Sequence, residues 1–170
     1  MTLHEIKLLH AFNAWATNRI FDAVGALPAD DVLKDMKSSH QGIHGTLFHI
    51  VAAEKIWLSR WVGNPDARLM AASEAPSLAD VKAVWEKAGF DMAKFLGSMS
   101  DKKLHETFTM TTSTGQTYTH LYWQAIQHLV DHSSYHRGQI ITLMRQLGHT
   151  PPSTGLIAFY REIAKGKGIG

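Results

Sequence analysis

Four long stretches of the chain place apolar residues at steps of three and four, and this spacing restricts the fold more than any other feature. Such steps match the 3.6-residue turn of an α-helix and give each helix one apolar face. The stretches cover residues 2–27, 39–62, 77–96 and 120–147. Four helices of this length, joined by modest connections, predict an all-α four-helix bundle that forms a single domain over residues 1–170.

Residues with known positional preferences indicate where these helices begin and end. Gly25 and Pro28 are expected to end the first helix. Ser77, with Asp80 three residues later, has the pattern of a capping box at the start of the third helix. Thr119 is expected to cap the fourth helix.

Two shorter elements complete the predicted fold. Residues 105–119 are rich in threonine and aromatic residues around Ser113, Thr114 and Gly115, which predicts a short β-hairpin before the fourth long helix. An isolated hairpin is marginally stable in water, so it should pack on the helices. A short C-terminal helix is expected over residues 155–165.

The composition excludes several classes of site and partner. The chain has no cysteine, which rules out a disulfide scaffold, a thiolate zinc site, an iron–sulfur cluster and a cysteine nucleophile. Lys and Arg total 17 against 15 Asp and Glu, so no charge excess favours nucleic acid. No apolar run approaches the ~20 residues of a membrane span. With no signal-peptide pattern over residues 1–5, we expect a cytoplasmic protein without nucleic-acid or membrane partners.

Histidine occurs 11 times, and the spacing of two of these residues points to a metal. His132 and His136 are four residues apart, so both imidazoles lie on one helix face, ~5–6 Å apart at Cβ. Leu129, Ile140 and Leu143 share that face, which therefore points into the bundle. The spacing alone leaves two interpretations open: a pair of hydrogen-bonded core histidines, or two ligands of one ion.

A metal site needs further ligands from elsewhere in the chain. His49 lies among apolar residues in the middle of the second helix, as either a core group or a ligand. Four histidines near helix ends or on mixed faces are interpreted as surface groups: His4, His10, His40 and His44. Of these, His44 is kept as a reserve ligand. His128 turns ~80° away from His136 and is a candidate ligand, a group that orients a ligand, or a surface residue.

The absence of two motifs narrows the type of metal site. No Glu is followed three residues later by His, which argues against a ferritin-like di-iron bundle, and no His-Glu-x-x-His occurs. Three histidines with an open position are typical of a catalytic site. Imidazole ligands suit zinc, nickel, copper or iron.

Four segments resemble those of one bacterial family. They are residues 12–17 (Phe-Asn-Ala-Trp-Ala-Thr), 47–54 (Leu-Phe-His-Ile-Val-Ala-Ala-Glu), 131–140 (Asp-His-Ser-Ser-Tyr-His-Arg-Gly-Gln-Ile) and 147–152, with its Leu-Gly and Pro-Pro pairs. In this order, they resemble the DinB family (the DinB/YfiT-like superfamily) of four-helix-bundle proteins over almost the whole chain.

The resemblance implies that His49, His132 and His136 hold one divalent metal ion. Zinc and nickel are the preferred candidates, ahead of iron and copper. It also implies an open coordination position and frequently a homodimer. Some relatives are metal-dependent thiol transferases or isomerases that use a low-molecular-weight thiol, and many others have no known activity.

Two functions follow as alternatives. The first is a metal-dependent enzyme of the thiol S-transferase, isomerase or hydrolase type that acts on a small molecule, with a low-molecular-weight thiol as co-substrate. The second is a non-catalytic metal-binding stress or sequestration protein. Near the ligands, Asp131 or Gln139 is a candidate to orient an imidazole, with His128 a further neighbour. Arg137 either holds a carboxylate of the thiol or forms an internal salt bridge, and no catalytic base is assigned.

Overall fold

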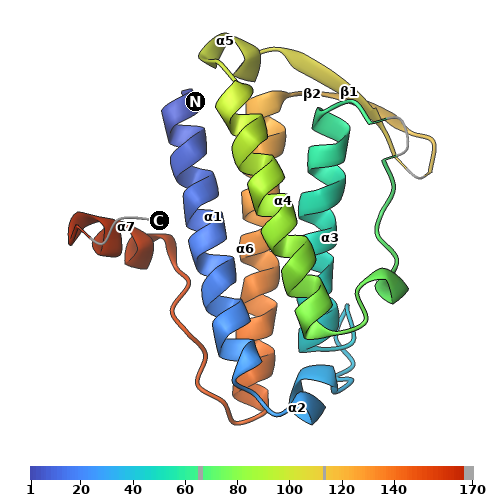
Figure 1. Ribbon diagram of the computed structural model, residues 1–170, viewed down its shortest axis with the longest axis vertical. Helices are drawn as coiled ribbons and strands as arrows, with labels where there is room; N and C mark the ends of the chain where they lie inside the picture. The colour runs from blue at the N-terminus through green and yellow to red at the C-terminus, as the bar shows by residue number, and fades with distance from the viewer. Residues whose placement is uncertain (65–66, 113, 167–170) are drawn as a thin grey trace.

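The structure is a computed structural model, and it describes residues 1–64, 67–112 and 114–166. Four long helices lie side by side and confirm the predicted bundle (Figure 1). They are α1 (Leu3–Gly25), α3 (Ile43–Trp61), α4 (Leu78–Ser98) and α6 (Tyr122–Gln146). The shorter elements are α2 (Ala29–Leu33), the 3-10 helix η1 (Ala72–Glu74), α5 (Asp101–Leu104), β1 (Thr107–Thr111), β2 (Thr117–Leu121) and α7 (Leu156–Ala164).

The long helices run in two parallel pairs. α1 and α6 descend in the view of Figure 1, whereas α3 and α4 ascend, because the connection after α3 returns along the length of the bundle. α6 packs against both α1 and α3, and α3 packs against α4. The core between them is aliphatic and includes Ile20, Leu47, Ile50 and Ile140, all fully buried. α6 therefore occupies a central place, facing both α1 and α3.

The second long helix begins four residues later than predicted. Residues 38–42 form a tight turn closed by a bridge between Ser38 and Gln41, and α3 begins at Ile43. Lys37 and Gln41 have φ values of 55° and 67°, in the left-handed region that a right-handed helix cannot use. The apolar spacing alone did not reveal this turn.

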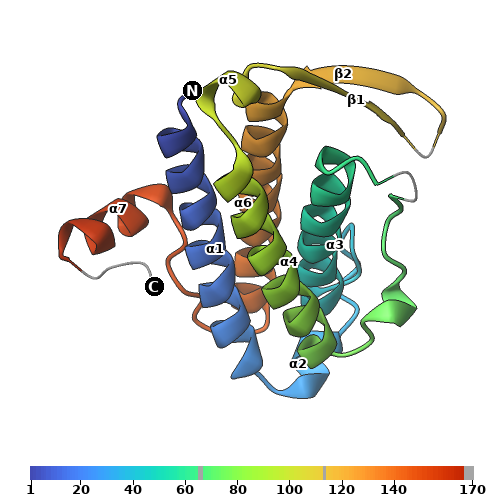
Figure 2. The same ribbon diagram turned by 45° about the horizontal axis from the view of Figure 1, so that its top comes forward.

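The predicted hairpin is present, but its second strand takes the residues expected to start the next helix. β1 and β2 pair antiparallel, with Thr109 opposite Thr119. Because Thr119 is paired in the strand, it does not cap α6, which begins at Tyr122. The hairpin crosses one end of the bundle (Figure 2). There the ring of Phe108 packs 5.0 Å from that of Tyr122 between centroids. Of the three predicted turn residues, Ser113 lies outside the described residues.

The C-terminal helix α7 lies outside the four-helix bundle against α1 (Figure 1). Its buried Phe159 packs 5.8 Å from the ring of Phe12 and 5.6 Å from that of Trp15. The indole of Trp15 also donates a hydrogen bond to Glu162, 3.2 Å away. Among the described residues, no helix is long and apolar enough to cross a membrane.

The capping box at Ser77 is present and yields a test of helix stability. The Ser77 hydroxyl accepts a hydrogen bond from the backbone N–H of Asp80, and Asp80 accepts one from the backbone N–H of Ser77. Replacement Ser77→Ala should lower the free energy of unfolding by about 1 kcal/mol in urea titrations, because an N–H at the helix start loses its partner. Ser77→Asn keeps an acceptor and should stay close to the wild type. Equal losses in both variants would contradict the capping role.

Candidate metal centre

Four histidine rings meet between α6 and the N-terminal half of α3. The ring centroid of His49 on α3 lies 4.9 Å from that of His132 and 4.5 Å from that of His136, both on α6. His40, from the turn before α3, lies 3.9 Å from His49. The three histidines predicted as ligands thus come together, and a fourth joins them.

The nitrogen atoms of this cluster approach within reach of one ion. Nε2 of His49 lies 3.0 Å from Nε2 of His132. Two nitrogens bound to one tetrahedral zinc at 2.0–2.1 Å lie about 3.3 Å apart. Nitrogens of His40, His49 and His136 also lie within 4.8 Å of one another. The nitrogen distances therefore group His40 with His49 and His136, and they pair His132 with His49.

His40 was predicted to be a surface group, and its place in the cluster corrects that prediction. It is half-buried because the turn before α3 folds back onto the helix. A Cβ at Gly45 would lie 2.1 Å from the carbonyl oxygen of His40, so only glycine permits this approach. Helical periodicity cannot place a residue in such a turn. His44, the reserve ligand, is half-buried on the first turn of α3 and is not among these rings.

Ring orientation bears on whether His132 or His40 joins His49 and His136 as a ligand. His40 and His49 are stacked with 17° between their planes, so their in-plane lone pairs run side by side and do not converge. The planes of His132 and His136 are tilted from His49 by 50° and 74°. Tilted rings can direct their lone pairs to one point. These ring orientations are compatible with one ion shared by His49, His132 and His136, whereas the stacked ring of His40 is poorly oriented to share an ion with His49.

Hydrogen bonding prepares His136 for a ligand role. Nδ1 of His136 lies 2.8 Å from Oε1 of Gln139, one turn later on α6. A carbonyl oxygen only accepts, so Nδ1 carries the proton and Nε2 keeps a lone pair. Nδ1 of His132 is buried without a hydrogen-bond partner in the described part of the chain. The cluster is therefore not a set of core histidines whose polar atoms are all satisfied.

Burial keeps the imidazoles of His49 and His132 uncharged at neutral pH. Burial, with smaller contributions from His40 and His136, lowers the pKa of His49 to about 4. It also lowers the pKa of His132 to about 4, aided by the neighbouring imidazoles. Burial, and then His136, lower the pKa of His40 as well. Because a metal binds the neutral form, the ring nitrogens do not have to lose charge-bearing protons first.

The other predicted neighbours lie in different places. His128 is exposed, and its ring lies 6.1 Å from that of His132 and 5.4 Å from that of Trp57 between centroids. Asp131 is exposed and lines a hollow beside Leu156, together with residues of α1 and α6. Among the four residues predicted to surround the ligands, Gln139 is the one that hydrogen-bonds a ligand histidine within the described ranges.

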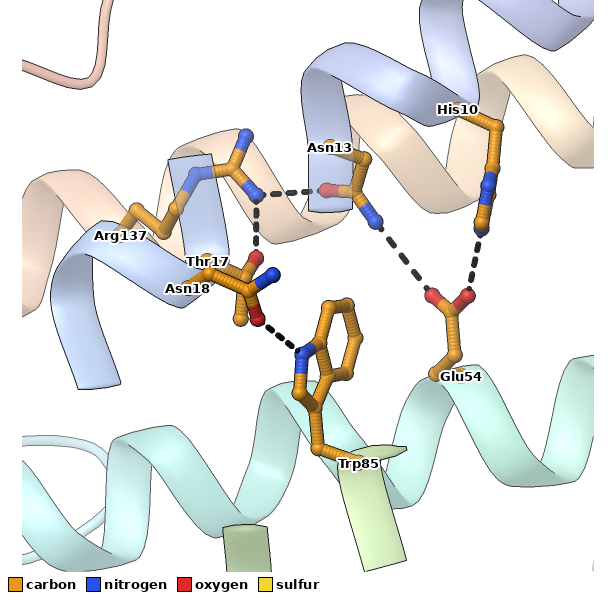
Figure 3. A network of polar contacts seen from close by, with 7 residues as sticks. All are labelled: His10, Asn13, Thr17, Asn18, Glu54, Trp85 and Arg137. Carbon is orange, nitrogen blue, oxygen red and sulfur yellow. Dashed lines mark hydrogen bonds and ion pairs between the residues drawn. The ribbon is translucent and has the colours of Figure 1, made fainter. Parts of the chain in front are cut away.

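Arg137 lies inside the bundle and holds α6 against α1 (Figure 3). Its side chain is almost completely buried, and Nη1 donates to Oδ1 of Asn13 at 2.5 Å and to the hydroxyl of Thr17 at 3.0 Å. Nη2 donates to the hydroxyl of Ser134 at 2.8 Å. Burial lowers the pKa of Arg137 to about 10, opposed by Glu54, so the guanidinium stays charged at pH 7. These contacts favour an internal role over binding of a thiol carboxylate.

Glu54 is the buried acid that balances this charge, and sequence analysis did not identify it. It is fully buried on α3 and accepts hydrogen bonds from Nδ2 of Asn13 at 3.4 Å and Nε2 of His10 at 2.9 Å (Figure 3). His10 was predicted to be a surface group, and it is buried because it supplies a donor to this carboxylate. An acid within the apolar stripe of the second helix was the signal for such a partner.

The depressed histidine pKa values predict how stability depends on pH in chelator-treated protein. His49 and His132 gain a proton near pH 4 when folded, but near 6.5 when unfolded. Between these values the unfolded chain binds more protons, so the free energy of unfolding falls as the pH drops from about 6.5 to about 4. Urea titrations at several pH values should show a shallower fall for a His49→Gln, His132→Gln double variant. The exposed His128→Gln variant removes only a minor influence on His132 and should change the slope less than the double variant does. A double variant that kept the wild-type slope would contradict this.

A second prediction concerns the buried charges. Replacement Arg137→Met should lower the free energy of unfolding by about 3–5 kcal/mol, because it leaves Asn13 and Thr17 without their buried donor and removes the positive charge near Glu54. The exposed Arg145→Met in the last turn of the same helix should cost less than about 1 kcal/mol. Urea-induced unfolding followed by circular dichroism measures both. A loss no larger for Arg137 than for Arg145 would show that the buried network contributes little.

Comparison with known proteins agrees with the resemblance found in the sequence. The sequence profile of the DinB family matches residues 1–165. Protein DinB of Bacillus subtilis (strain 168) is 23% identical over 166 residues, which cover 92% of this chain and 95% of that protein. An uncharacterized protein of the same organism, YizA, is 27% identical over 131 residues, covering 77% of this chain and 80% of its own. The match over nearly the whole chain establishes that this protein belongs to the DinB family.

Proposed function

We propose that this protein binds one divalent transition-metal ion through His49, His132 and His136 and uses it as a metal-dependent enzyme acting on a small molecule. The reaction would be of the thiol S-transferase, isomerase or hydrolase type. The observation that carries the proposal is the convergence of three mutually tilted imidazoles from α3 and α6. Membership of the DinB family is compatible with metal binding by these residues.

The donor set fits a borderline transition metal. Neutral imidazole nitrogens suit zinc or nickel, and iron and copper also accept them. Three protein ligands leave a coordination position for a small molecule, as in catalytic zinc sites. When bound, the metal would lower the pKa of a thiol or water molecule at that position and so supply a nucleophile at neutral pH.

Three residues around the proposed ligands hold or border their rings. Gln139 fixes the ring of His136, and His40 stacks on His49 and limits its rotation. Tyr135, which is 67% exposed, packs its ring 5.1 Å from that of His136 at the solvent edge. Because the chain has no cysteine, a thiol nucleophile must come from a low-molecular-weight co-substrate.

Metal analysis of single-histidine variants tests the ligand set. Purified without a histidine tag, the wild type should contain about one equivalent of metal by elemental mass spectrometry. His132→Ala should lose the metal, since it removes a converging donor, whereas His40→Ala should retain it. His128→Ala, one turn away on the same helix, is the matched control and should retain it as well. Loss of the metal in His40→Ala with retention in His132→Ala would instead assign the ligands as His40, His49 and His136.

Catalysis needs a separate test, because metal binding alone also fits a sequestration protein. Metal-loaded wild type should accelerate the reaction of a bacterial low-molecular-weight thiol with an electrophile, and His132→Ala should not. His128→Ala should keep the rate of the wild type. A full equivalent of metal without any acceleration across a panel of thiols and electrophiles would count against the enzyme and favour sequestration.

A further inference from the structure

A groove runs between α3 and α4 on a face of the bundle that the histidines do not use. Its volume is about 560 Å³, and its floor is apolar, with Leu58 from α3 and Val84, Ala88 and Phe95 from α4. Leu58 is nine residues after His49, which places it about 180° around α3. The groove is therefore separate from the candidate metal centre.

The sequence leaves this groove open through small side chains between two parallel helices. Ala88 and Ser59 occupy positions where larger residues would fill the space between α3 and α4. At one end, Phe95 stacks on Trp61 with centroids 5.7 Å apart and 18° between the planes. Phe95, packed against Trp61, therefore forms an apolar end of the groove.

The rim of the groove is positively charged. Lys55, Lys87 and Lys94 line it and are exposed, whereas Asp91 is the single acid in the lining. Asp91 pairs with Lys87 at 2.9 Å. Three lysines against one aspartate leave a net charge of +2 around an apolar floor. The groove thus combines a surface for hydrocarbon with a cationic edge.

We propose that this groove binds a single-chain amphiphile with an anionic end, of the fatty-acid class. Its volume lies within the range of about 300–1,000 Å³ that is usual for small-molecule sites. The apolar floor would bury the methylene chain, and the long lysine side chains would reach the carboxylate from the rim. A second copy of the chain fits less well, because a two-fold contact through this face would bring two lysine rims together.

Binding of a homologous series of ligands tests the chemistry of the groove. Saturated carboxylates of increasing chain length, each below its micelle concentration, are titrated into the full-length protein and followed by calorimetry. Affinity should rise by up to about fourfold for each added methylene until the groove is full. The corresponding neutral alcohols should bind about tenfold more weakly. Absence of saturable binding, or equal affinity for acids and alcohols, would overturn the proposal.

Two kinds of variant locate the binding. Ala88→Trp fills the floor and should abolish binding of both series. The double variant Lys55→Glu, Lys94→Glu should weaken carboxylates about tenfold and leave alcohols unchanged. Lys82→Glu, which reverses an exposed charge on α4 outside the groove, is the control and should bind as the wild type does.

The charge variants test whether the groove binds the carboxylate even if Ala88→Trp fails to fold, which circular dichroism would reveal. Carboxylate affinity unaffected by the double charge reversal would overturn the proposal. So would a dimer in sedimentation experiments that the groove variants convert to a monomer, since a second copy would then occupy the groove.

Discussion

A positive and a negative charge lie inside this bundle, and the amide of Asn13 joins them. Its oxygen accepts from Arg137 on α6, and its nitrogen donates to Glu54 on α3. A buried charge without a partner is costly, so all three helices must keep the relative positions at which these contacts form. His136 directly precedes Arg137, and His49 lies on the same helix as Glu54. The network therefore also holds in place the two helices that carry the imidazole cluster.

Helix-forming periodicity was sufficient to predict the bundle, and a threonine-rich, aromatic composition predicted the hairpin. The meeting of His49, His132 and His136 was implied by the resemblance to the DinB family and was left open by spacing alone. Periodicity was insufficient wherever the decisive contact was distant in sequence or lay in a turn. His40 joins the cluster through a turn whose left-handed residues leave no periodic signal. His10 is buried by its pairing with a carboxylate 44 positions later in the chain. A histidine on a mixed helix face gives no sign of such a partner.

α3 serves two sides of the molecule. One side presents His49 to α6, and the opposite side forms the floor and rim of the groove with α4. The first side is lined by rings that burial keeps neutral, and the second by exposed lysines over aliphatic side chains. Because a rigid helix connects the two sides, a ligand that shifted α3 against α4 would also move His49 relative to α6.

The contact between Nε2 of His49 and Nε2 of His132 has a consequence for the proposed binding of an ion. Two neutral rings can make this 3.0 Å contact only if one Nε2 bears a proton and the other a lone pair. Presenting both Nε2 lone pairs to a cation requires that proton to move to Nδ1 of its own ring. Loading would therefore switch the tautomer of one imidazole, leave the number of protons on the pair unchanged and break one hydrogen bond. His136 needs no such switch, because Gln139 already holds its proton on Nδ1.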